Sequence, residues 1–291
     1  MRCVVERQDE GDWMSLKLEK APVQWGDLVF HVLAHVPPAR RVAASVYDKV
    51  YVDFVKKHAG PASGRTLAED AQALGKLAVT HEELASVQQL AWLHETIKSA
   101  QAAARWELRE LGPEQVDAPE VLSGLVRTAP AAELLRCAAL LEEQVWASLP
   151  AEVDGRALQQ AFEIVMPTAP WLHRCRVRLV RSLRLRGRVR GNEIWVGMPM
   201  VALDLGSEHV AWQAAHEATV REASVMARKN GMSATYGLVE PVAVVALASR
   251  SKRAGLQHEH GNWYGHLARP PSIHPEPLLP EQRHLLTQML E

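Results

Sequence analysis

Hydrophobic residues recur every three or four positions over the first 165 residues, which is the spacing of amphipathic helices. Pro37-Pro38 interrupts the first such segment, and Thr80 and Glu83 have the spacing of a capping box at a helix N-terminus. The first 20 residues are mixed and predict a short β-hairpin. We expect a helical region over 1–165, with helices at about 26–57 in two parts, 67–77, 81–111, 118–127, 131–148 and 155–165.

From residue 175 to 198 apolar and charged residues alternate, which is the period of β-strands. Gly187 and Gly191-Asn192 are turn residues, so this stretch predicts a two- or three-stranded antiparallel unit. Helical spacing returns further on, and a stretch rich in His and Pro predicts irregular structure. We expect a second region over 166–291, with helices at about 208–229, 239–250 and from Pro280, and irregular chain over 258–277. The fold class is α+β and mainly α-helical, with a small antiparallel sheet.

The composition narrows the class of protein. The chain has 291 residues, a formal net charge of −1 and 47% hydrophobic residues, as soluble globular proteins have. Its three cysteines are far apart, which fits a reducing compartment rather than a disulfide framework. No signal peptide is apparent, and the apolar run at 239–249 is too short to span a bilayer. We expect a cytoplasmic protein without membrane association.

The segment AAHEATVREAS, residues 214–224, begins like the zinc-binding helix H-E-x-x-H. His216 and Glu217 match, but the position of the second histidine holds Val220. The other neighbours of His216 on a helix face, Thr219 and Ala223, are not zinc ligands either. The helix therefore supplies one metal ligand rather than two, and an isolated His-Glu pair is more often structural.

Other histidines offer weaker alternatives. His258 and His260 belong to a stretch that also holds Glu259 and His266, and they could replace a missing ligand, although solvated side chains are the more ordinary interpretation. His31 and His35 are one helical turn apart among apolar residues, which favours core histidines.

Eight arginines lie between residues 174 and 190, with no acidic residue among them. Because side chains alternate along a strand, 174, 176 and 178 are expected to share one face, as are 184, 186, 188 and 190. Such a face could be solvated and paired with acidic residues, could hold an acidic peptide, or could bind nucleic-acid phosphates. Trp195 is the only aromatic residue in the strands, so we rank a peptide above nucleic acid.

The order of segments in the second region resembles the glutamate-ligand zincins (gluzincins). The stretch NEIWVGM would be the edge strand that aligns a substrate, VAWQAAHEATV the helix with the motif, and YGLVEPVAVVALA the next helix. The resemblance implies that His216 is the first metal ligand, Glu217 the general base and Glu240 the third ligand. Val220 departs from the pattern, so a zincin-like region with a degenerate metal site is expected.

The truncated motif behind a hairpin also resembles the peptidase-like, peptide-binding proteins of crocagin-type biosynthesis. That likeness implies a non-catalytic protein without a cofactor, which presents an acidic precursor (leader) peptide of a ribosomally made natural product (RiPP) to tailoring enzymes. The residues expected to hold the peptide are Arg176, Arg178, Arg184, Arg186, Arg188, Arg190, Glu193, Ile194, Trp195 and Val196. The alternatives are a zinc-dependent peptidase using His216, Glu217 and Glu240, and a protein that binds nucleic-acid phosphates.

Overall fold

The computed structural model of the chain describes residues 17–19, 24–34, 49–59, 90–92, 96, 99, 154–183, 187–199, 205–266 and 277–291. Helix accounts for 73% of these residues, which confirms the mainly helical α+β class. The α-helices are α1 (Gln24–Ala34), α2 (Lys49–Ala59), α7 (Gly155–Val165), α8 (Ser207–Lys229), α9 (Tyr236–Arg253), α10 (Gln257–His266) and α11 (Pro280–Leu290). Short 3₁₀ segments are η2 (Leu90–Trp92), η5 (Met166–Thr168), η6 (Pro170–Arg174) and η7 (Arg181–Leu183).

Four strands form one mixed sheet: β1 (Lys17–Glu19), β2 (Arg176–Val180), β3 (Gly187–Arg190) and β4 (Glu193–Gly197). Their order is β1-β2-β4-β3, with β1, β2 and β4 parallel and β3 antiparallel to β4. The predicted hairpin is present, and its turn contains Gly191 with φ of 60°. Two expectations were wrong: the sheet is not purely antiparallel, and β4 is an interior strand rather than an edge.

The cause of this order is the path of the chain after β2. Instead of turning back beside β2, the chain forms η7, where Ser182 is anchored to Asp27 of α1. It returns at the far side of β4 as β3, so β4 lies between β2 and β3.

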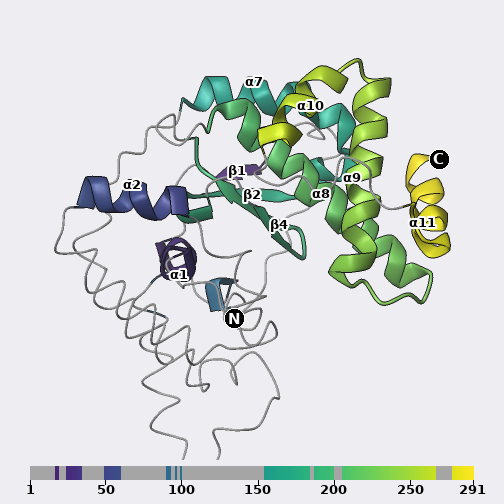
Figure 1. Cartoon of the computed structure of the whole chain (residues 1–291), viewed down its shortest axis with the longest axis horizontal. Coiled ribbons are helices and arrows are strands. Elements are labelled where there is room, and N and C mark those ends of the chain that lie inside the picture. The colour runs from purple at the N-terminus through teal and green to yellow at the C-terminus, as the bar shows by residue number, and fades with distance from the viewer. Residues whose placement is uncertain are drawn as a thin grey trace, which may run out of the picture.

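The strand register divides the side chains between two faces. Trp195 lies beside Arg178 and Arg188 on one face, and α1 covers it there. The other face carries apolar residues, among them Val177 and Ile194, which are fully buried on the side of α8. In Figure 1, α1 lies on the opposite side of the strands from α7 and α10.

A close approach of backbone to ring fixes α1 on the sheet. A side chain at Gly26 would meet Trp195, since a Cβ there would lie 1.9 Å from a ring carbon. Phe30 meets the same ring edge-on, and Trp92 of η2 lies against it with centroids 4.0 Å apart. Asp27, the residue after Gly26 in α1, accepts a hydrogen bond from the Ser182 amide.

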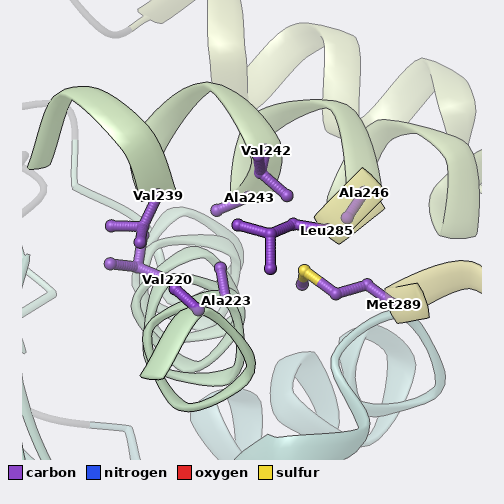
Figure 2. Close-up of a cluster of buried hydrophobic side chains, with 9 residues drawn as sticks. Val220, Ala223, Val239, Val242, Ala243, Ala246, Leu285 and Met289 are labelled. Carbon is purple, nitrogen blue, oxygen red and sulfur yellow. The ribbon is translucent and has the colours of Figure 1, made fainter. Parts of the chain in front are cut away.

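A second core lies where α8, α9 and α11 meet (Figure 2). Leu285 and Met289 of α11 reach between the other two helices. The buried members of this aliphatic cluster are Val220, Ala223, Ala227, Val239, Val242, Ala243, Ala246, Leu285 and Met289.

The helices predicted in the second region are confirmed near their expected positions, as α8, α9 and α11. In the first region, the expected helix 155–165 is α7, whose N-cap Asp154 accepts two backbone hydrogen bonds. The irregular structure predicted from residue 258 was wrong up to His266, because α10 forms there and packs Trp263 against α8. The predicted helices 67–77, 118–127 and 131–148, most of 81–111 and most of the N-terminal hairpin lie outside the described residues.

None of the described helices combines the length and the apolar character needed to cross a membrane.

Candidate functional site

The predicted ligands on α8 and α9 lie together. Gly231, with φ of 70°, turns the chain between the two helices, which then pack against each other. This packing brings His216 of α8 to Glu240 of α9, and His216 Nε2 is 3.1 Å from Glu240 Oε1. Both side chains are largely shielded from solvent, at 9% and 20% exposure. The resemblance to the gluzincins named these two residues as metal ligands; they do lie together, and metal binding by them stays a prediction.

The charge on His216 depends on its carboxylate neighbours. Burial alone lowers the pKa of His216, but the charge and hydrogen bond of Glu240, with Glu217 adding to them, outweigh burial and raise the pKa to about 9. His216 is therefore an imidazolium at neutral pH. Its positive charge neutralises Glu240 inside the fold.

Glu217 points away from that pair and towards the sheet. Its side chain lies against Gly187 of β3, where a Cβ would come within 2.4 Å of Glu217 Cγ. Gln213, one helical turn earlier, donates a hydrogen bond to Glu217 Oε1 at 3.0 Å. Burial raises the pKa of the Glu217 carboxyl, the His216 charge opposes that effect, and Glu240 adds to it.

Aromatic residues of α8 and α10 enclose the other side of His216. The Trp263 ring lies 5.7 Å from the His216 ring and stacks on Trp212. His260 meets Trp212 edge-on at 5.4 Å. Burial, with the His216 charge nearby, lowers the pKa of His260 to about 4, so this histidine is neutral where His216 is charged. Burial and Glu240 raise the pKa of Tyr264.

The described donors around His216 include one helix position that cannot bind zinc. Val220, at the position of the second ligand, is 8% exposed and belongs to the aliphatic cluster with Val239 and Leu285. Structural and catalytic zinc sites take at least three protein ligands. Among the residues that the structure describes, no group of three His, Cys, Asp or Glu side chains is arranged to hold a metal ion.

Four of the expected arginines (Arg176, Arg178, Arg188 and Arg190) share one face of the sheet by strand register, but they differ in exposure. Arg174 belongs to η6 rather than to a strand. Arg178 is buried, and its Nε lies 2.6 Å from Glu193 Oε1. Arg176 is exposed, and Arg188 and Arg190 of β3 are half-buried. The expected residues Arg184 and Arg186 lie outside the described part of the chain.

The remaining predicted peptide-binding residues belong to β4. Ile194, Trp195 and Val196 are at most 2% exposed, because β4 is interior and both of its faces are covered. These side chains contribute to the core. Glu193 is half-buried at the start of the strand.

Sequence reasoning missed several residues around His216. Gln213 and Gly187 position Glu217, and Trp263 covers His216. The spacing of Trp212, Gln213, His216 and Glu217 along one helix face was a usable signal. No comparable signal marked Gly187, because its contact joins two segments whose relative placement depends on the fold.

No protein-family model, no curated protein and no solved structure matches the chain.

Proposed function

We propose that this protein binds an extended, acidic peptide without cleaving it, on a scaffold that resembles a peptidase with an incomplete metal site. The observation that carries the proposal is the pairing of His216 with Glu240 beside an aliphatic Val220. A metal ion would have to displace the proton that His216 shares with Glu240, and a valine cannot replace the missing ligand.

Peptide binding is supported by the main chain of β3. Among the described residues, β3 pairs with β4 alone, so no described strand lies at its other edge, where Arg188 donates a hydrogen bond to the Gly187 carbonyl at 2.7 Å. In a hairpin with a two-residue turn, the pair that flanks the turn is hydrogen-bonded, and the next pair is not. Here the next pair is Val189 and Ile194, so the N–H and C=O of Val189 point away from β4. The peptide strand would therefore pair with β3 rather than with β4.

The position of that edge favours a site close to the paired residues. Gly187 of β3 contacts Glu217, which follows His216 on α8. A peptide strand on β3 would thus run beside the zincin-like helix. By the resemblance to crocagin-type proteins, the occupant would be a precursor peptide held in the cytoplasm for tailoring enzymes.

The first test measures binding and cleavage together. The full chain is immobilised and incubated with a degenerate peptide library, and mass spectrometry reads both the retained peptides and any shortened products. We expect retention without shortened products. Val189→Pro, which removes the outward N–H, should abolish retention, whereas Val189→Ala keeps that N–H and should retain peptides. Cleavage by wild type that is abolished in Glu217→Gln would instead support the alternative of a zinc-dependent peptidase.

The second test asks whether Val220 is the missing ligand position. Val220→His places an imidazole one helical turn from His216, on the side of Glu240. We expect this variant to bind about one zinc ion per chain by elemental analysis, as three ligands allow. Ser224→His, on the same helix, should bind none. Stoichiometric zinc in the wild type would contradict the proposal.

A further inference from the structure

The outer edge of β3 is covered at one point by a side chain of the same strand. Gly187 and Val189 both lie opposite partners of β4 to which they are not hydrogen-bonded, so their main-chain N–H and C=O point away from β4. Arg188, between them, donates a hydrogen bond from Nη1 to the Gly187 carbonyl at 2.7 Å. One of the outward carbonyls that a further strand would use is therefore already paired.

The side chain of Arg188 reaches this carbonyl by curling over the edge of the sheet. Strand alternation places Arg188 on the face of Trp195, whereas Gly187 faces Glu217 of α8. The charge of Arg188 nevertheless acts on Glu217 and lowers the pKa of its carboxyl, against the larger effect of burial. The half-buried guanidinium of Arg188 therefore lies across the outer edge of β3, between the two faces of the sheet.

This hydrogen bond makes the β3 edge selective for the charge of an incoming strand. A hydrogen bond from a charged donor is stronger than one between neutral groups. A neutral strand that pairs with the Gly187 carbonyl breaks this bond and gives the guanidinium no acceptor of comparable strength in return. A carboxylate accepts two parallel hydrogen bonds from one guanidinium, so an aspartate or glutamate of the incoming strand replaces the broken bond by a stronger one.

We infer that Arg188 is a gate on the β3 edge and that it selects an acidic peptide over a neutral one. In the free protein Arg188 covers the Gly187 carbonyl, and in the complex it turns to a carboxylate of the bound strand. The peptide residue opposite Arg188 projects from the same face of the sheet, so the carboxylate is needed at that position. The inference rests on the proposed function and adds to it the residue that sets the charge preference. Charged side chains commonly exclude unwanted strands from sheet edges in this way.

The test measures binding of two peptides to four forms of the full chain. Arg188→Met removes the charge and the donors but keeps the length of the side chain, and Arg188→Lys keeps the charge and a donor. The comparison variant, Arg190→Met, removes a charge from the same face of β3 and leaves the Gly187 carbonyl covered. Fluorescence anisotropy reads binding of a labelled decapeptide of alternating Thr and Asp (the Asp peptide) and of alternating Thr and Asn (the Asn peptide).

We expect wild type to bind the Asp peptide about tenfold more tightly than the Asn peptide, as one charged hydrogen bond implies. Arg188→Met should bind the Asn peptide about fivefold more tightly than wild type does, because the Gly187 carbonyl is uncovered, and should lose the preference. Arg188→Lys should keep a preference for the Asp peptide. Arg190→Met should weaken binding of the Asp peptide by at most about threefold and should not raise affinity for the Asn peptide. Circular dichroism should show the same helix content in all four forms.

Three outcomes would overturn the inference while leaving the proposed function standing. Unchanged affinity of Arg188→Met for the Asn peptide would mean that Arg188 does not close the edge. Equal effects of Arg188→Met and Arg190→Met would assign the preference to the total charge of β3. Self-association of Arg188→Met in light scattering, without tighter binding of the Asn peptide, would mean that Arg188 protects the edge only from other copies of the chain. Binding of neither peptide by any form, with no peptide retained in the library assay, would overturn the proposed function itself.

Discussion

α1 and α8 cover opposite faces of the same strands, and an acid shielded from solvent lies on each side: Asp27 of α1 on one, and Glu240 of α9, which packs against α8, on the other. On the α1 side, Asp27 is held by the neutral amide and hydroxyl of Ser182. On the α8 side, a carboxylate faces the imidazolium of His216. In the first contact the side-chain and backbone donors of Ser182 are uncharged, with the charge of Arg181 nearby, whereas in the second an imidazolium faces a carboxylate directly. A charged pair costs more to bury than a neutral contact, so removing one of its partners should destabilise the fold more.

The largest effect expected from this comparison is the loss of the charged contact. His216→Leu leaves Glu240 without its imidazolium and leaves the buried Glu217 with the charge of Arg188 alone. We expect urea unfolding to show a loss of about 3 kcal/mol in the free energy of unfolding. His216→Leu/Glu240→Leu removes both partners and should recover most of that loss, since replacing a buried pair by apolar residues is often neutral. If His216→Leu is as stable as wild type, the contact between His216 and Glu240 contributes little to stability.

The α1 side should be most sensitive to added volume. Gly26→Ala places a methyl group 1.9 Å from the rigid ring of Trp195, so the helix must move off the sheet. We expect the free energy of unfolding, measured with heat or urea, to fall by about 3 kcal/mol. This loss is expected although alanine is ordinarily a better helix former than glycine by about 1 kcal/mol. Gly26→Ala/Trp195→Leu makes room for the methyl group and should be more stable than Trp195→Leu alone. Gly26→Ala at wild-type stability would mean that α1 is not packed this closely.

The buried carboxyl on the α1 side predicts that the free energy of unfolding depends on pH. Burial raises the pKa of Asp27 from 3.8 to about 6, against the opposing hydrogen bonds of Ser182. The folded state therefore binds the proton of Asp27 more tightly than the unfolded state does. The resulting contribution of Asp27 to stability is full below pH 3.8 and is lost as the pH rises through about 6. A shift of this size corresponds to about 3 kcal/mol between these limits.

Urea unfolding between about pH 4 and pH 7 measures this contribution. Asp27→Asn should remove about 3 kcal/mol of pH dependence from the wild-type profile. Asp53→Asn, at an exposed position of α2, is the matched control and should leave the profile unchanged. Identical profiles for wild type and Asp27→Asn would refute the burial of this carboxyl.

The same two sides explain what the sequence could and could not predict. Periodicity is local, so it located α7, α8 and α11 and the alternating strands. The order of the strands is not local, because it depends on the anchoring of Ser182 by Asp27, 155 residues earlier. As a result β4 was taken for an edge strand.

Within the candidate site, the resemblance to the gluzincins named His216 and Glu240 together through the order of two helices. The sequence did not predict α10, whose residues include Gly261 and Gly265 and have weak helical preference. Packing of Trp263 on Trp212 stabilises α10, which its local sequence does not. The burial of Arg178 was missed for a similar reason, since its partner Glu193 belongs to another strand.

The smallest expected loss of stability is that of Gly187→Ala. This substitution compares the α8 side of the sheet with the α1 side most directly. Gly187→Ala puts a methyl group 2.4 Å from Glu217 Cγ, a similar overlap to the one at Gly26. Here the obstacle is a flexible side chain that can rotate away, so we expect a loss of only about 1 kcal/mol. The displaced carboxyl would leave the amide of Gln213, and peptide retention on the adjacent β3 edge should fall more than stability does. A loss as large as that of Gly26→Ala, with retention unchanged, would mean that the α8 side is a rigid structural contact like the α1 side.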